Sequence, residues 1–259
     1  MELTDTQRQE FIEQGYVRIP NVVPRSLVIA AMRAINHSLG EGIDPAQLTT
    51  FRSRSYCPEL QKESVITDLY NATLAKALAE SLIGAGQVAP ITAGQIALRF
   101  PSMQAQPVMG QPHLDGMYSP NNGVPKGRIM SFTMLLGIML NDVSDDWAGN
   151  LAVWPGTHKQ YEDYFRQHGP EALLQGMPPI HMPQPEMVKG NAGDIVMAHY
   201  QLAHTAAPNV SPNTRYAIYF RLRHVKHDDQ WKEAMTDIWM EWPGVRTPGV
   251  RTPRRSDAN

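Results

Sequence analysis

The sequence predicts a mainly β fold with helices, of the α+β class: a double-stranded β-helix, or cupin-like jelly-roll barrel, braced by helices near the N-terminus. In the first part of the chain, to about residue 86, apolar residues recur at helical spacing. From about residue 92 to 225, short strand-like segments separated by Gly, Pro and Asn turns follow instead. The chain has 259 residues, a length that β-rich barrels often reach as one domain. We therefore expect one domain over residues 1–243 and a basic, disordered tail over 244–259.

The helical part opens with a capping signal. The Thr-x-x-Gln spacing from Thr4 predicts a short helix that ends near Gly15, and the alternation after it predicts a strand over 16–20. Periodic apolar residues predict two longer helices, over 24–39 and 65–83. The residues between these two helices indicate a loop.

Five segments of the second part have the composition of strands and are bounded by turn residues. They are residues 95–100, 129–140, 150–154, 194–198 and 215–223. A helical insertion is expected over 161–174, whereas 235–242 fits either a helix or a strand.

Composition limits the classes of function. Apolar residues make up 42% and charged residues 19% of the chain, which is typical of a globular protein with a sizeable core. The formal net charge of −2 favours neither nucleic acid nor an anionic membrane as a partner. Cys57 is the one cysteine, so no internal disulfide can form. No secretory signal or membrane-spanning run is visible, and we expect a cytoplasmic protein.

A His-x-Asp pair, His113 and Asp115, is the first candidate for chemistry. On an extended strand the two side chains point the same way, while Leu114 points to the opposite face. A histidine from a later strand, His204 or its rival His199, would complete two imidazoles and one carboxylate. Such a set holds iron in non-heme Fe(II) oxygenases and leaves coordination positions open, although two histidines and a carboxylate can also hold zinc.

Further features follow in a fixed order. They are a strand that runs into a Pro-Gly turn from Gly149 to His158, the pair Gly193-Asp194, and Asn209 with Arg215 at five and eleven residues after His204. Together with the N-terminal stretch Leu3 to Val17, this order resembles the phytanoyl-CoA dioxygenase (PhyH) family of Fe(II)- and 2-oxoglutarate-dependent oxygenases. The resemblance extends from residue 1 to about 223.

The resemblance implies a role for each matching residue. His113, Asp115 and His204 match the iron ligands, and His204 is preferred to His199 because Arg215 stands at the family spacing from it. Arg215 matches the arginine that holds the distal carboxylate of 2-oxoglutarate, a task for which its two-pronged guanidinium is suited. The implied activity is hydroxylation of a substrate with O2 and release of succinate and CO2. A carboxylate ligand at Asp115 favours hydroxylation over halogenation. Desaturation, epimerisation and ring formation stay open, because they begin with the same hydrogen abstraction.

Other residues are expected to support this site. Gln95 and Arg99 share one face of their strand, so both are candidates for binding cosubstrate or substrate. Thr133 lies on an otherwise apolar strand and is expected to assist Arg215. Met117 and Tyr118 are expected to line a substrate pocket. Two further residues have structural interpretations: Trp154 as core, and His158 as part of the Pro-Gly turn.

The sequence leaves three alternatives to an oxygenase. They are a cupin-like metal-binding protein without oxygenase activity, a zinc hydrolase, and a relative that binds 2-oxoglutarate or another small acid only as a regulator. A carboxylate clamp at Arg215 favours the oxygenase. The expected lids are the loops 40–65, 116–128 and 160–190. No strongly basic cluster lies near them for the phosphates of coenzyme A, which favours a small metabolite or natural product over an acyl-CoA. Nothing in the sequence indicates the oligomeric state.

Overall fold

The computed structural model describes residues 2–246. Its helices are α1 (Asp5–Gln14), α2 (Arg25–Gly40), α3 (Leu48–Ser53), α4 (Ser64–Asn71), α5 (Leu74–Ile83), α6 (Thr157–His168) and α7 (His227–Thr236), with short 3-10 turns at η1 (Pro45–Gln47), η2 (Pro58–Leu60), η3 (Pro170–Gln175) and η4 (Pro243–Arg246). Its strands are β1 (Tyr16–Ile19), β2 (Gln95–Arg99), β3 (Met134–Met139), β4 (Leu151–Val153), β5 (Glu186–Met187), β6 (Ile195–His199), β7 (His204–Ala206) and β8 (Arg215–Leu222).

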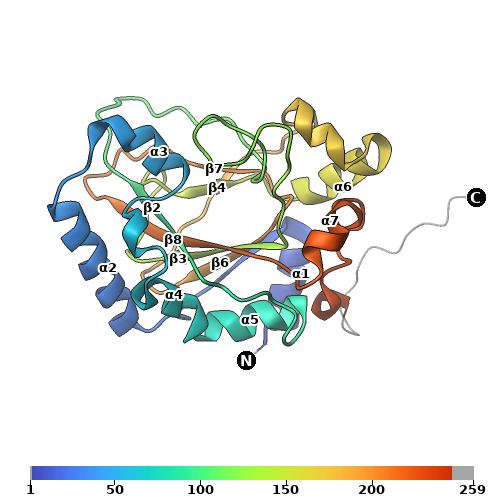
Figure 1. The fold of residues 1–259 in the computed structure, drawn as a ribbon, viewed down its shortest axis with the longest axis horizontal. Coiled ribbons are helices and arrows are strands. Elements are labelled where there is room, and N and C mark those ends of the chain that lie inside the picture. Colours follow the sequence, from blue (N-terminus) through green and yellow to red (C-terminus); the bar gives the residue numbers. More distant parts are fainter. Residues whose placement is uncertain (1, 247–259) are drawn as a thin grey trace, which may run out of the picture.

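The strands form two antiparallel sheets. The larger has the order β1-β6-β3-β8-β2 and the smaller β5-β4-β7. Figure 1 shows the smaller sheet lying across from the larger one, with α2, α4 and α5 against the outer face of the larger sheet. Helices and antiparallel sheets are thus segregated as an α+β fold requires.

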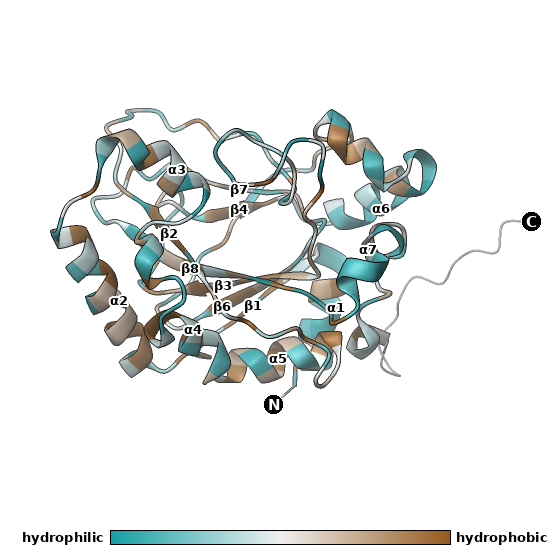
Figure 2. Ribbon diagram, viewed as in Figure 1, coloured by the Kyte–Doolittle hydropathy of each residue, from teal (hydrophilic) through white to brown (hydrophobic). Residues whose placement is uncertain are grey.

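The larger sheet is covered on both faces. Every residue of β3 is buried. Leu136 and Ile138 belong to the core that the sheet forms with the N-terminal helices. Leu135 and Met139, which point the other way, pack in a second core between the sheets and α6. The sequence of a strand that is buried on both faces is a continuous apolar run rather than an alternation of apolar and polar residues. Figure 2 shows hydrophobic residues along the strands of this sheet and on α2, whereas α7 is largely hydrophilic.

Two helical predictions need correction. The helix expected over 65–83 is two helices, α4 and α5, because Thr73 starts a new one: its hydroxyl accepts a hydrogen bond from the Ala75 N–H and donates one to the Leu69 carbonyl. A threonine that caps in this way competes with continuation of the helix. The loop expected between α2 and α4 contains a further short helix, α3.

The packed chain continues past residue 243. In η4, Val245 is fully buried, and a Cβ atom at Gly244 would lie against the backbone of Ser81 in α5. The rest of the predicted tail, residues 247–259, lies outside the described residues. Within residues 2–246, no helix is long and apolar enough to cross a membrane.

Candidate metal centre and cosubstrate pocket

A cavity of about 630 Å³ lies between the two sheets. Its walls come from β2, β3 and β8 of the larger sheet, from β4 and β7 of the smaller sheet, from the end of α3 with Arg54 after it, and from the loop 113–124. Because these segments are far apart in the sequence, the fold alone brings their side chains together.

His113 and His204 are neighbours through their backbones. The His113 N–H donates to the His204 carbonyl at 3.0 Å, and the reverse bond measures 3.1 Å. This single antiparallel bridge adds His113 to the edge of the smaller sheet, beside β7, and the two ring centroids lie 4.6 Å apart. His113 is therefore held in a bridge rather than in the longer strand that its sequence indicates.

Asp115 reaches the same point from a tight turn. Gly116 has φ +81°, and a Cβ atom there would come within 2.4 Å of the Met130 carbonyl oxygen. Glycine is therefore required for the chain to turn this closely. The Asp115 Oδ1 atom lies 3.6 Å from His113 Nε2 and 3.9 Å from His204 Nε2. One donor atom from each residue lies within 4.8 Å of the other two, so together they could hold a metal ion.

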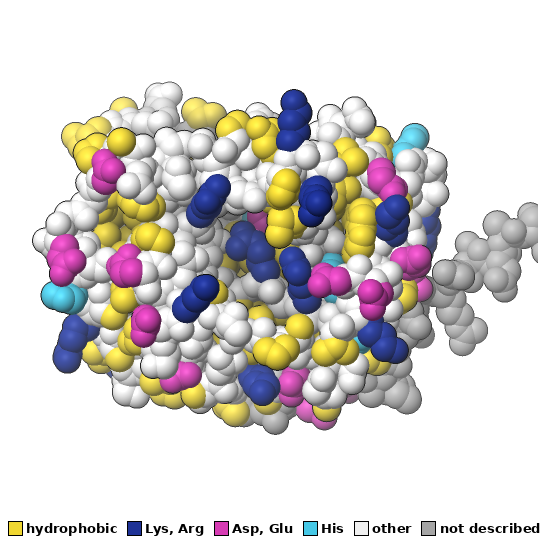
Figure 3. Space-filling model, viewed as in Figure 1, with side chains coloured by type: hydrophobic (Ala, Val, Ile, Leu, Met, Phe, Trp, Pro, Cys, Tyr) yellow, Lys and Arg dark blue, Asp and Glu magenta, His cyan; other side chains and the backbone are white. Residues whose placement is uncertain are grey.

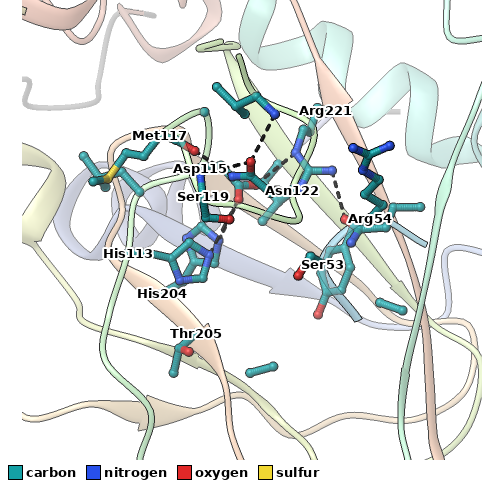
Figure 4. Close-up of a pocket in the computed structure, with 18 of the residues that line it drawn as sticks. Ser53, Arg54, His113, Asp115, Met117, Ser119, Asn122, His204, Thr205 and Arg221 are labelled. Carbon is teal, nitrogen blue, oxygen red and sulfur yellow. Dashed lines mark hydrogen bonds and ion pairs between the residues drawn. The ribbon is translucent and has the colours of Figure 1, made fainter. Parts of the chain in front are cut away.

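Arg221 controls the charge of Asp115. Its Nε and Nη2 atoms lie 3.0 Å and 2.9 Å from Asp115 Oδ2, which leaves Oδ1 facing the imidazoles (Figure 4). Burial alone would raise the pKa of Asp115, but Arg221 and the two histidines outweigh it and hold the pKa well below its usual value. A carboxylate kept ionised in this way is suited to a metal.

His204 is set in the form that binds metals. Its Nδ1–H donates to the Leu202 carbonyl at 2.9 Å, so Nε2 faces the cavity without a proton. Burial and the neighbouring His113 lower the pKa of His204 to about 4. A neutral imidazole oriented by a backbone carbonyl is the usual state of a metal ligand.

His199, the rival for the third position, lies in the core instead. Its Nε2–H donates to the Ile238 carbonyl at 3.0 Å, and its Nδ1 accepts from the Gln201 N–H at 3.0 Å. Its ring stacks on Trp242. His158 lies beside it in the first turn of α6 and contacts the carbonyl of Ile12 in α1 rather than only shaping the Pro-Gly turn.

Two arginines face each other at another part of the cavity wall. Arg99 and Arg215 are directly opposite in the β2–β8 register, and both line the cavity. Arg215 donates from Nε to the Gly149 carbonyl at 2.7 Å and from Nη1 to the Ala97 carbonyl at 2.9 Å. Burial and the charge of Arg215 lower the pKa of Arg99 to about 10. Among the described residues no carboxylate pairs with either guanidinium, so this pair, in which Arg215 is buried and Arg99 is half-buried, is suited to an anion.

The remaining predicted residues divide into two groups. Gln95, Met117 and Tyr118 line the cavity, and Gln95 Oε1 accepts from Arg221 Nη1 at 2.9 Å. Thr133 does not line it. Its hydroxyl donates to Glu241 at 2.6 Å and accepts from the His224 N–H at 2.7 Å, so the structure separates it from Arg215.

Two other expectations can be compared with the structure. Trp154 is buried in the core between the sheets, as expected. The Asn209 amide donates to the Arg99 carbonyl and to the Asn213 carbonyl, both at 2.7 Å. Asn209 thus joins the end of β2 to the turn that leads into β8.

Residues 11–217 match the family model of phytanoyl-CoA dioxygenase (PhyH). The chain belongs to this family. No curated protein matches it. PhyH-family enzymes use Fe(II), 2-oxoglutarate and O2, and the His/Asp/His set with a nearby anion site fits those groups chemically. As a member of the PhyH family, the chain is a 2-oxoglutarate-dependent oxygenase, as the order of motifs in its sequence indicated.

Solved structures support the PhyH fold. The α-ketoglutarate-dependent carbocyclase SnoK from nogalamycin biosynthesis is 20% identical with a TM-score of 0.52, over 85% of this chain and 84% of SnoK. The epimerase SnoN from nogalamycin biosynthesis is 19% identical with a TM-score of 0.54, over 83% and 78%. HygX from Streptomyces hygroscopicus, solved with nickel and 2-oxoglutarate bound, is 16% identical with a TM-score of 0.53, over 86% and 88%. At these identities the likeness concerns the fold, and it confirms the predicted class of helices with antiparallel sheets.

The sequence reasoning missed Arg221, although a signal was present. Alternate residues of a strand share a face, so Arg221 points to the same side of β8 as Arg215.

The prediction that no basic cluster lies near the lids was wrong, because arginines from separate segments converge on the cavity. Two predicted lids, 40–65 and 116–128, contribute residues to its wall. No residue of 160–190, all of which the structure describes, does so.

Proposed function

We propose that the protein hydroxylates a small molecule, with Fe(II) held by His113, Asp115 and His204 and with 2-oxoglutarate anchored through its distal carboxylate by Arg215. The observation that supports this is the presence, in one cavity, of a His/Asp/His set and of the Arg99–Arg215 pair, which has no carboxylate partner among the described residues. Bound Fe(II) supplies the oxidising chemistry, which uses 2-oxoglutarate and O2 to oxidise a substrate C–H bond with release of succinate and CO2.

The protein's own residues orient and shield this chemistry. Arg221 keeps Asp115 ionised and turns one carboxylate oxygen toward the imidazoles. Arg215 is held rigidly by two backbone carbonyls, and its Nη2 atom has no hydrogen-bond partner among the described residues. Gly149 allows this arrangement, because a Cβ atom there would lie 2.8 Å from Arg99 Cβ and 3.1 Å from Arg215 Cβ. A preorganised guanidinium loses little freedom when it binds a carboxylate.

A zinc hydrolase is the main alternative, and the charges of the cavity disfavour it. A hydrolase needs no buried guanidinium pair beside its metal. The chain does contain a second hydrogen-bonded set, in which His227 contacts Ser131 Oγ at 3.0 Å and Glu241 Oε2 at 2.9 Å. All three side chains are buried and none lines the cavity, so the set has no access to substrate.

The test is a spectroscopic titration. Anaerobic protein with Fe(II) and 2-oxoglutarate should show the weak visible charge-transfer band of an iron–2-oxoglutarate chelate. We expect Arg215→Gln to need about tenfold to a hundredfold more 2-oxoglutarate, because it loses a charge-assisted hydrogen bond. Arg33→Gln, at an exposed position of α2, is the matched control and should behave as wild type. Bound iron without a band would contradict the proposal.

A further inference from the structure

The cavity is strongly cationic. It is lined by Arg52, Arg54, Arg99, Arg215, Arg221 and Arg223, and Asp115 is the one acidic residue that the described chain contributes to its wall. Figure 3 shows Lys and Arg side chains gathered in and around a hollow near the centre of one face of the molecule. Walls of one charge in a concave site focus the electric field on whatever enters.

This positive charge exceeds what the chain and the cofactors neutralise. Arg221 is paired with Asp115, and Arg223 lies 3.3 Å from Asp228. Fe(II) and 2-oxoglutarate carry equal and opposite charges, so loading both leaves the balance of the cavity unchanged. Arg52, Arg54 and the Arg99–Arg215 pair together then retain a surplus of positive charge. This surplus attracts a further anion to the cavity.

Two of these arginines stand at the mouth, away from the metal ligands. Arg52 is in the last turn of α3 and Arg54 follows this helix. Figure 4 shows Arg54 on the far side of the cavity from His113 and His204. The charge of Arg52 helps to lower the pKa of Arg99, so the mouth and the interior pair are within electrostatic reach of each other.

The mouth is also preformed. Arg54 Nε donates to the Asn121 carbonyl at 3.2 Å, which joins α3 to the loop opposite. Asn122 holds this loop in shape: its amide donates to the Met117 carbonyl at 2.6 Å, and its Oδ1 accepts from the Ser119 and Val124 N–H groups. Among the described residues, neither Arg52 nor Arg54 is paired with a carboxylate. Both charges thus lie at the opening, and the Arg54 guanidinium is fixed there by its contact with the loop.

We propose that the substrate to be oxidised carries an oxyanion, a carboxylate or a phosphate, which Arg52 and Arg54 bind at the mouth of the cavity. The rest of the substrate extends inward past Met117 and Tyr118, so that its reacting carbon lies near His113 and His204. This inference rests on the proposed function for the identity of the reaction. The anion site itself can be tested without turnover.

The experiment measures binding to the full chain loaded with Ni(II) and saturating 2-oxoglutarate. Three probes with the same ring are titrated by calorimetry: benzoate, phenyl phosphate and benzyl alcohol. We expect one or both anions to bind and the neutral alcohol to bind at least about tenfold more weakly, since only the anions form charge-assisted hydrogen bonds. The tighter anion identifies the group as carboxylate or phosphate. Its affinity should fall as NaCl is raised, because the mouth is exposed.

Matched variants locate the site. The double variant Arg52→Gln/Arg54→Gln should lower the affinity for the anion by about tenfold or more. The control Arg25→Gln/Arg33→Gln loses the same charge at exposed positions of α2 and should leave this affinity unchanged. The single variant Arg52→Gln, which removes no hydrogen bond that the structure shows, serves if the double variant misfolds.

Three results would overturn the inference: no binding of either anion, equal binding of benzyl alcohol, or wild-type affinity in the Arg52 variants. Wild-type 2-oxoglutarate affinity is measured separately. Failure of 2-oxoglutarate to bind would count against the proposed function, whereas failure of the probes alone would count against the anion site.

Discussion

Two pairs of histidine rings lie side by side among the described residues, and one of these pairs has the surroundings of a metal site. His113 and His204 have ring centroids 4.6 Å apart, and His158 and His199 have ring centroids 5.6 Å apart. Proximity therefore does not separate them. In the first pair each Nε2 faces the Asp115 carboxylate in a cavity. In the second pair each Nε2–H donates to a backbone carbonyl in the core.

The difference shows what converts imidazoles into ligands. His158 and His199 are enclosed with Trp239, and among the described residues no carboxylate is hydrogen-bonded to either ring. Burial lowers the pKa of both, so they are neutral and serve as packing. A carboxylate, a free ring nitrogen and an open cavity are all needed for a metal centre.

The largest expected effect is that replacing a histidine of one pair changes metal binding, whereas replacing a histidine of the other pair changes stability. His204→Ala should abolish detectable Ni(II) binding while changing thermal stability little, because its ring lies at a cavity. His199→Ala should keep Ni(II) binding but lose about 3 kcal/mol of unfolding free energy, from a core void and an unpaired Ile238 carbonyl. Calorimetric titration and urea denaturation measure the two quantities. Loss of Ni(II) binding in a folded His199→Ala protein would invalidate the comparison.

The second expected effect is a pH dependence of stability. The pKa of His199 is lowered by burial to about 4, whereas an unfolded histidine has a pKa of about 6.5. Between these values the unfolded chain binds the extra proton, so stability is present above about pH 6.5 and is lost as pH falls toward 4, by roughly 3 kcal/mol. Urea denaturation of metal-free protein at several pH values measures this loss.

The control is His199→Gln, whose amide can still donate to the Ile238 carbonyl but does not titrate. His204 is retained in this variant and contributes equally to both proteins. The stability of His199→Gln should therefore depend less steeply on pH than that of wild type. Identical slopes would show that His199 is not the buried neutral group inferred here.

The smallest effect concerns the support of the metal site. Arg221→Gln should weaken Ni(II) binding by about tenfold to a hundredfold, because Asp115 loses its orienting partner and part of its charge stabilisation. Arg221→Lys keeps the charge but loses the contact through two nitrogen atoms, so its affinity for Ni(II) should lie between those of wild type and Arg221→Gln. Calorimetry measures the affinities, and Arg33→Gln is the control for lost surface charge. Equal affinity in wild type and Arg221→Gln would remove Arg221 from the site.

Local patterns in the sequence sufficed for the strands β2 and β8, because alternation over a few residues follows from the backbone geometry of a strand. The spacing of the His-x-Asp pair singled it out, although the structure holds the pair in a bridge and a tight turn rather than in a strand. The proposed role of Arg215 came from the resemblance to the family. The break at Thr73 was also readable, because a threonine directly before an apolar run is a capping signal. The apolar periodicity that continues through it favoured one helix instead.

Tertiary structure decided the rest. The resemblance already favoured His204 over His199, but the physical reason, which is the set of carbonyls and carboxylates around each ring, is visible only in the tertiary structure. The β2–β8 register sets Arg99 directly opposite Arg215, although 116 positions separate them in the chain. No spacing rule reports which distant strands will pair or at what register. The cationic cavity was hidden for the same reason. Its arginines come from three separate stretches of the sequence, and their charges add only where the fold brings those stretches to one surface.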